Sequence, residues 1–284
     1  MRAALIVNDR AGSLAGLVAP RAALSAALTT GGFVLCEAVR DGATLDEQWA
    51  NALGCNAEVI FVAGGDGTLR DAAARLLDGR SAFAPLPGGT MNRVCARLGL
   101  PLDPVAAAAA YRPGPMTALD VATANDEVFL YQSIVGVPSR LMRFREMQRG
   151  AGWRGWWPVV RAALRELTRP SSSSLAVRTG VRRRKGGHAA VITLPGPGEP
   201  PRLTLDLARP TGPFARLRQA IRWFRGGLAA DGEVETLSAS HLVVHGRNPS
   251  LRLSLDGEMR LIPGPVRFRL RPGALRLLAP PVGA

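Results

Sequence analysis

Short apolar runs alternate with amphipathic stretches along the first part of the chain. The apolar runs, which predict strands, span residues 3–7, 33–39, 57–63 and 82–87. The amphipathic stretches, which predict helices, span residues 13–32, 44–53, 68–79 and 88–99. Ser13 is the predicted N-cap of the first helix and Gly31-Gly32 its stop. This strand–helix alternation predicts an α/β domain with a parallel sheet and helices on both faces.

The pattern changes after Pro113, where apolar and polar residues begin to alternate in short segments. Predicted strands span residues 116–126, 127–137, 174–181, 188–194, 202–207, 241–246, 251–257 and 266–271. A helical insert is predicted at Pro158–Leu167. We therefore expect a first domain of residues 1–115 and a second, mostly antiparallel β domain of residues 116–284. Whether the last ~15 residues return to the first domain is left open.

One strand-to-helix junction is unusually rich in glycine: Gly64, Gly65, Asp66, Gly67 and Thr68 follow an apolar run. Glycine allows close backbone approach to a ligand, and a helix N-terminus offers free N–H groups, so the junction suits phosphate. Asp66 would repel an anion, so it either organises Mg²⁺ or braces the loop. Thr68 either caps the helix or bonds a phosphate oxygen. The alternative is a plain strand-to-helix turn.

A second junction repeats this design at Gly88, Gly89, Thr90 and Asn92, and Asn8 also follows a predicted strand. The carboxyl ends of parallel strands share one edge of a sheet. We therefore expect Asn8, Gly64–Thr68 and Gly88–Asn92 to converge and to form a nucleotide site. Neither a P-loop nor a dinucleotide fingerprint occurs, and Lys185 is the sole lysine, which disfavours those two kinds of site.

Near the C-terminus, Asp256 and Glu258 flank Gly257. On a strand, residues two apart face the same side. Both carboxylates could then address one metal ion or one hydroxyl proton. A polar turn is the alternative.

Composition adds a strong basic bias, with a formal net charge of +14. This predicts an anionic partner: nucleic acid, a membrane surface or a phosphorylated substrate. No spanning apolar run and no secretory leader is recognisable, which favours a cytosolic protein. The cysteines Cys36, Cys55 and Cys95 lack metal spacing and are predicted to be buried, reduced thiols. The three histidines show no metal or triad spacing.

Residues 139–169 hold eight arginines and two acidic residues, with Trp153, Trp156 and Trp157 just before the predicted helix. Tryptophan and arginine beside an amphipathic helix fit a membrane interface. The alternative is a helix that covers the second domain. Residues 182–185 are predicted to form a basic hairpin tip, either solvated or in contact with anionic headgroups.

Taken together, the motifs resemble the diacylglycerol kinase catalytic-domain family, the bacterial lipid kinases related to sphingosine kinases. "GGDGTLRDAAARLL", "PLPGGTMNRVCARLGLP", "LSLDGE" and "FRLRPGALRLLAP" match family segments. The first motif is shared with NAD kinases and phosphofructokinases, but the combination is fairly specific to lipid kinases.

The resemblance implies a β-sandwich second domain, an interdomain cleft and ATP-dependent phosphorylation of a lipid hydroxyl. Asn8, Gly64, Gly65, Asp66, Gly67, Thr68, Gly89, Thr90 and Asn92 would bind ATP, with Mg²⁺ at Asp66. Glu258 would be the general base with Asp256 beside it. The implied partner is a lipid at a membrane surface with anionic lipids, for a cytoplasmic, peripherally bound protein. Nucleic acid is not expected, because no binding motif accompanies the charge.

The chain departs from the family pattern at Ala11, Arg93 and Ala96, and it lacks the family's metal-binding aspartate motif near residues 199–206. These departures keep two alternatives open: a non-catalytic nucleotide- or lipid-binding protein, and an NAD kinase-like enzyme with a soluble acceptor. We expect Arg93 either to contact a phosphate or to lie in solvent on a helix surface.

Overall fold

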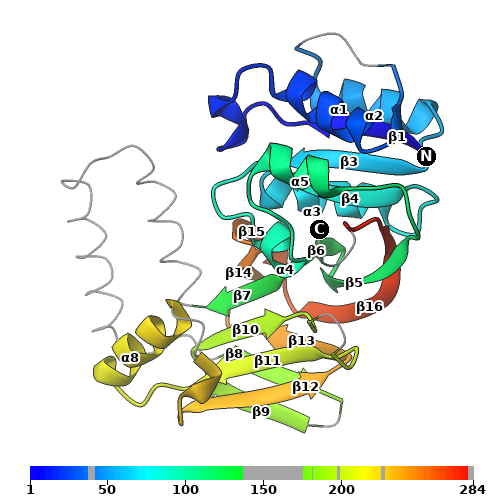
Figure 1. Ribbon diagram of the computed structural model, residues 1–284. Coiled ribbons are helices and arrows are strands. Elements are labelled where there is room, and N and C mark those ends of the chain that lie inside the picture. The colour runs from blue at the N-terminus through cyan, green and yellow to red at the C-terminus, as the bar shows by residue number, and fades with distance from the viewer. Residues whose placement is uncertain (38–41, 137–174, 181, 197–198, 225–227, 281–284) are drawn as a thin grey trace. The chain divides into compact units, whose positions relative to one another are not determined.

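The computed structural model describes residues 1–37, 42–136, 175–180, 182–196, 199–224 and 228–280 (Figure 1). The chain divides into two compact units. The first contains Met1–Val121 and the segment from Arg271 onward, and the second contains Ala122–Leu270. None of the helices in the described ranges is long and apolar enough to cross a membrane.

The first unit is built on a parallel sheet in the order β2-β1-β3-β4. Its strands are β1 (Arg2–Val7), β2 (Val34–Leu35), β3 (Val59–Gly64) and β4 (Ala82–Pro87). Every residue of β3 and β4 is buried, as expected for strands covered on both faces. The end of β16 (Val266–Leu277) adds a parallel partner, because Leu277 pairs with Phe83 of β4. The predicted α/β class is confirmed.

The helices of this unit are α1 (Pro20–Thr30), α2 (Leu45–Gly54), α3 (Asp66–Leu76), α4 (Arg93–Arg97) and α5 (Pro104–Ala110). The prediction that α1 begins at Ser13 is wrong, since Ser13 precedes only the short 3-10 turn η1 (Leu14–Gly16) and makes no capping bond. Pro20 explains the difference, because proline fits the first turn of a helix but not its interior. Of the strand predicted at 33–39, residues 34 and 35 form β2, the neighbours 33, 36 and 37 are not strand, and 38–39 lie outside the described residues.

The second unit is a β-sandwich, which confirms the predicted architecture. One sheet has the order β12-β11-β10-β7-β14-β15, and the other contains β16, β13, β8 and β9, with β5 beside β16 and β6 beside β5. The strands of the first sheet are β12 (Val234–Ala239), β11 (Leu203–Ala208), β10 (Ala189–Thr193), β7 (Gln132–Gly136), β14 (Ser250–Leu255) and β15 (Glu258–Pro263). Alternate residues of both sheets, among them Val135, Leu205, Val244 and Phe268, form one buried apolar core.

The remaining strands are β5 (Thr117–Ala124), β6 (Glu127–Phe129), β8 (Leu175–Thr179), β9 (Arg182–Gly187) and β13 (His241–His245). The basic stretch 182–185, predicted as a hairpin tip, is instead part of β9, and the chain turns before it at Gly180 with φ +56°. Helix α8 (Pro213–Phe224) and the 3-10 turn η3 (Leu228–Ala230) were not predicted. Most of the arginine- and tryptophan-rich segment 139–169, with its predicted helix, lies outside the described residues.

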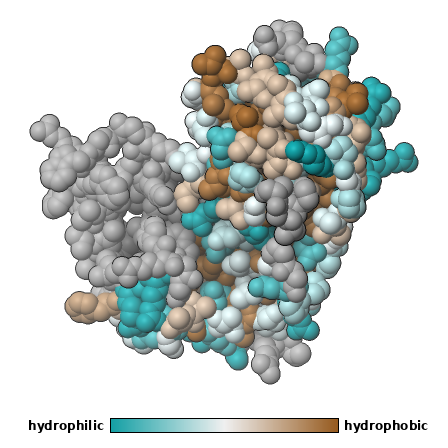
Figure 2. Space-filling view, in the orientation of Figure 1, coloured by the Kyte–Doolittle hydropathy of each residue, from teal (hydrophilic) through white to brown (hydrophobic). Residues whose placement is uncertain are grey.

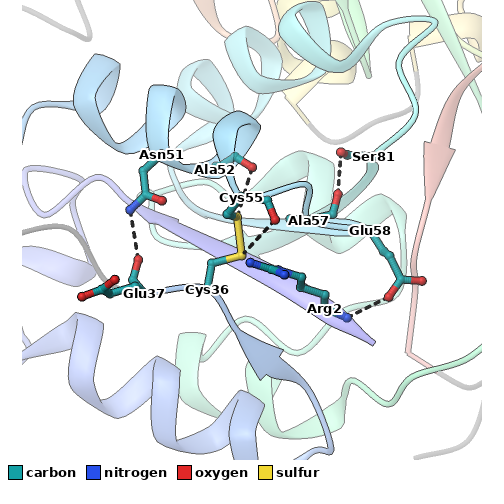
Figure 3. The surroundings of a disulfide bond; sticks show 9 residues. All are labelled: Arg2, Cys36, Glu37, Asn51, Ala52, Cys55, Ala57, Glu58 and Ser81. Carbon is teal, nitrogen blue, oxygen red and sulfur yellow. Dashed lines mark hydrogen bonds between the residues drawn. A yellow bond between two sulfur atoms is a disulfide. The ribbon is translucent and has the colours of Figure 1, made fainter.

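A disulfide joins Cys36 and Cys55, so the prediction of three reduced, buried thiols is wrong (Figure 3). Cys36 follows β2 and donates its N–H to the Ala3 carbonyl at 2.8 Å, and Cys55 ends α2. A hydrogen bond from Asn51 Nδ2 to the Glu37 carbonyl, at 3.0 Å, supports the same junction. The two cysteines are 19 residues apart in sequence, and only the fold brings their Cα atoms to 6.3 Å. Cys95 remains a buried free thiol.

Candidate active site

Three loops meet at the carboxyl edge of β1, β3 and β4. Asn8 donates its backbone N–H to the Ala63 carbonyl at 2.9 Å, and its side-chain Nδ2 donates to Thr68 Oγ1 at 2.8 Å. The N–H of Ser13 donates to the Gly88 carbonyl at 3.0 Å. The convergence predicted for Asn8 and the two glycine-rich junctions is therefore confirmed.

The two glycine-rich junctions approach so closely that side chains would not fit between them. A Cβ added to Gly89 would lie 2.6 Å from Gly65 Cα, and one added to Gly88 would lie 2.8 Å from Gly64 N. A Cβ on Gly12, in the loop after β1, would lie 2.9 Å from Thr90 Oγ1. Here glycine is required by backbone proximity rather than by an unusual φ. The result is a continuous backbone surface, which we call the glycine cradle: residues 64–68 and 88–90.

Helix α3 begins within the glycine cradle. Its first backbone hydrogen bond runs from Leu69 N to the Gly65 carbonyl at 3.0 Å, so the preceding N–H groups have no acceptor within the helix. Residues 65–68 are half-buried and thus within reach of a ligand. Free N–H groups and the positive end of the helix dipole favour an anion at this point.

Asp66 braces the glycine cradle from within. Its Oδ1 accepts a hydrogen bond from Val94 N, in the first turn of α4, at 3.0 Å. Helix α4 needs this external acceptor, because its own N-cap residue, Asn92, makes no side-chain cap. The bracing role considered for Asp66 is therefore present. Among the described residues, no group of three or more His, Cys, Asp or Glu side chains could hold a metal ion by itself.

Asn92 stabilises the second junction by hydrogen bonds within that junction. It is buried, has φ 47°, accepts at Oδ1 from Gly89 N at 2.7 Å and donates from Nδ2 to the Gly89 carbonyl at 3.0 Å. Its amide thus shapes the loop, whereas the neighbouring Thr90 is exposed. Arg93 is half-buried at the first position of α4.

A buried glutamine on α2 fixes the end of β1 and was missed by the sequence analysis. β2 pairs with β1 only at Arg2 and Ala3, so the later backbone groups of β1 need other partners on that side. Gln48 accepts from Val7 N at 2.8 Å and donates to the Val7 carbonyl at 3.1 Å, directly before Asn8. Arg21 donates to Gln48 Oε1 at 2.6 Å. The one feature of the sequence that could have indicated Gln48 is the position of a polar residue on the buried face of a predicted helix.

Two titratable groups near the glycine cradle, Cys95 and Tyr111, are neutral at physiological pH. Burial, with a smaller contribution from the charge of Asp66, raises the pKa of the Cys95 thiol to about 12. Burial also raises the pKa of Tyr111 well above its usual value, and the Tyr111 hydroxyl donates to the Pro85 carbonyl at 2.9 Å. These groups serve packing rather than proton transfer.

Asp256 lies in the tight turn between β14 and β15, and Glu258 directly follows that turn, so the structure shows the polar-turn alternative rather than two carboxylates on one face of a strand. Asp256 and Gly257 are the two turn residues, with φ 49° and 96°, as a two-residue hairpin of this kind requires. Only Glu258 belongs to a strand, as the first residue of β15.

The two carboxylates have different surroundings. Asp256 is buried and accepts backbone hydrogen bonds from Leu130 at 2.7 Å, Tyr131 at 2.8 Å and Gln132 at 2.9 Å. It therefore holds the bend between β6 and β7. The Glu258 side chain is 45% exposed and lies 3.4 Å from Arg260 Nη2. Glu258 is thus the carboxylate that a substrate can reach.

Comparison with known proteins identifies the family. A family model described as the diacylglycerol kinase catalytic domain matches residues 2–124. A "probable lipid kinase YegS-like" of Pseudomonas fluorescens is 30% identical over 244 residues, covering 78% of this chain and 77% of that protein. Its namesake from Pseudomonas putida is 29% identical over 259 residues, covering 81% and 80%. The chain belongs to the diacylglycerol kinase catalytic-domain family of lipid kinases.

A solved structure supports the same fold. The crystal structure of a diacylglycerol kinase from Bacillus anthracis str. Sterne matches 100% of this chain and 98% of its own, with a TM-score of 0.68 and 18% sequence identity. The resemblance inferred from the glycine-rich and Asp-Gly-Glu motifs is therefore confirmed at the level of family and fold.

Proposed function

We propose that this protein is an ATP-dependent lipid kinase that transfers the γ-phosphate to a lipid hydroxyl, with a diacylglycerol-like acceptor. The observation that carries the proposal is the glycine cradle, in which two backbone turns touch at the N-terminus of α3. Such a surface offers N–H groups to phosphate oxygens where any side chain would obstruct them.

Each nucleotide-binding residue has a separate proposed part. The N–H groups of residues 64–68 bind the ATP phosphates, and Thr90 adds a hydroxyl from the exposed side of the second junction. Asn8 and Asn92 hold the loops in shape, through Thr68 and Gly89 respectively. Arg93, at the start of α4, supplies positive charge to a phosphate.

The site suits Mg²⁺ held jointly with ATP. Proteins usually bind Mg²⁺ through one or two carboxylates together with substrate phosphates, so a single aspartate is sufficient. Asp66 is half-buried, and its bond to Val94 N uses one carboxylate oxygen. The ion would neutralise charge on the phosphate oxygens.

We assign the general base to Glu258. The lipid hydroxyl oxygen forms a bond to the γ-phosphorus, the bond from that phosphorus to the β–γ bridging oxygen breaks, and ADP leaves. The hydroxyl proton passes to the Glu258 carboxylate. Asp256 supports the turn that presents Glu258, because its own oxygens bind three backbone N–H groups.

The test is transfer of labelled γ-phosphate from ATP into a mixed lipid extract in detergent micelles with Mg²⁺. Wild type and Glu258→Gln are compared, and products are separated by lipid class. A labelled lipid that is absent with Glu258→Gln would support the proposal and name the acceptor class. If folded wild type binds ATP but labels no lipid, the proposal fails. The remaining functions are then a non-catalytic binding protein or a kinase with a soluble acceptor.

A further inference from the structure

One sheet of the second unit has an outward face that is basic. In β8, β13 and β16, the residues that point into the sandwich core include Val177, Val244 and Phe268, all almost fully buried. Because side chains alternate along a strand, the intervening residues point outward. The outward residues Arg178, His241, His245, Arg267 and Arg269 form what we call the basic face.

The strand register brings these residues side by side. Arg267 of β16 lies opposite Val243 of β13, which lies opposite Arg178 of β8. In the next row, Arg269 lies opposite His241. Neighbouring strands are about 4.8 Å apart, so the guanidinium-bearing positions of the first row are about 10 Å apart across the sheet.

Among the described residues, no carboxylate forms an ion pair with the three arginines of the basic face. Arg178, Arg267 and Arg269 are all exposed. No acidic residue occupies an outward position of β8, β13 or residues 266–270 of β16. Elsewhere in this unit, arginines do find acidic partners: Arg184 with Glu235, and Arg218 with Asp231.

We propose that the basic face docks on a bilayer surface rich in anionic phospholipid, an inference that rests on the proposed lipid kinase function. Guanidinium groups bind phosphate oxygens in pairs, and lipid headgroups present these oxygens in a plane that matches a sheet face. The outward positions of β8, β13 and residues 266–270 of β16 contain no Phe, Tyr or Trp for stacking on nucleobases, which disfavours single-stranded nucleic acid. Figure 2 shows hydrophobic and hydrophilic residues interspersed on the visible described surface.

The test measures binding to vesicles by flotation. Vesicles contain either phosphatidylcholine alone or phosphatidylcholine with an equal amount of phosphatidylglycerol. The test variant is Arg178→Ala/Arg267→Ala/Arg269→Ala. The control, Arg2→Ala/Arg80→Ala/Arg252→Ala, removes the same charge from exposed arginines outside the basic face.

Wild type should bind the anionic vesicles and not the neutral ones. An arginine near an anionic surface strengthens binding about fivefold, so the test variant should bind about a hundredfold more weakly. The control should change binding by no more than a few fold. Equal losses in both variants would overturn the proposal, since net charge alone would then explain binding. Binding to duplex DNA is measured for the same proteins. If the test variant lost DNA binding but kept vesicle binding, the proposal would be overturned in favour of nucleic acid.

Docking and catalysis are separated by an assay in detergent micelles. The test variant should transfer phosphate to micellar lipid as wild type does, with an unchanged thermal midpoint. If wild type transfers no phosphate but binds anionic vesicles through the basic face, the kinase function fails and the docking surface stands. If transfer occurs in micelles and the test variant still floats with anionic vesicles, the docking surface fails and the kinase function stands.

Discussion

At the scale of single residues, the candidate site depends on glycines, because a side chain at these positions would not fit. Gly89→Ala would place a Cβ 2.6 Å from Gly65 Cα, which forces the two junctions apart. We expect a loss of about 1–3 kcal/mol in the free energy of unfolding, the usual cost of overpacking. Gly16→Ala is the matched control, because nothing lies within 4 Å of the added Cβ. Urea unfolding of both variants checks this, and equal stability of the two would contradict the close contact.

Cys95 gives a prediction at alkaline pH. Its pKa is raised from 9.0 to about 12, mainly by burial, so the folded state keeps the thiol proton after the unfolded state has lost it. The resulting stabilisation is complete below about pH 9 and is lost as the pH rises toward 12. Between about pH 9 and about pH 11 we expect wild type to lose on the order of 2 kcal/mol more stability than Cys95→Ala. Parallel pH dependences in urea unfolding would refute a protonated, buried thiol.

At the scale of elements, the disulfide ties the end of β2 to the end of α2, the helix that carries Gln48. Removing it with Cys36→Ser/Cys55→Ser should lower the free energy of unfolding by about 3 kcal/mol, because the closed loop no longer restricts the unfolded chain. Wild type in dithiothreitol should unfold at the same urea concentration as the double variant. Identical midpoints for oxidised wild type and the double variant would mean that the cross-link does not stabilise the fold.

The turn between β14 and β15 separates the roles of its two carboxylates. Asp256→Ala removes an acceptor from three backbone N–H groups, one of them fully buried, so we expect a loss of about 3 kcal/mol in stability. Glu258→Gln should change stability by no more than about 0.5 kcal/mol, because its side chain is partly exposed. Thermal unfolding of the two variants measures the difference. If both variants lost similar stability, the claim that Asp256 supports the turn and Glu258 does not would be contradicted.

Several elements could be predicted because local pattern and topology agree. The apolar runs at β3 and β4 predict parallel strands. Because parallel strands end at the same edge of the sheet, the glycines that follow them were expected to lie together. Other features depend on contacts distant in sequence. No local pattern relates the residues that join in three places: Cys36 with Cys55, Gln48 with Val7, and Asp256 with the backbone of residues 130–132. The start of α1 is set by Pro20, which fits only the first turn of a helix, and the apolar periodicity does not indicate this.

At the scale of the whole molecule, the two units carry different parts of the proposed chemistry. The first holds the glycine cradle, and the second holds Glu258 and the basic face. The net charge of +14 draws the protein toward anionic surfaces in general, whereas the three arginines of the basic face would select one face for contact. Sequence alone supplied the charge, and only the strand register placed those arginines together.

The most direct test of the kinase function is the initial rate of phosphate transfer to micellar lipid as a function of ATP concentration. It is measured for wild type, Gly89→Ala and Glu258→Gln. We expect Gly89→Ala to raise KM for ATP, because the glycine cradle is the proposed nucleotide site. We expect Glu258→Gln to lower kcat by about a hundredfold or more with KM for ATP unchanged, because a general base acts in the chemical step. An unchanged KM in Gly89→Ala together with full kcat in Glu258→Gln would contradict both assignments.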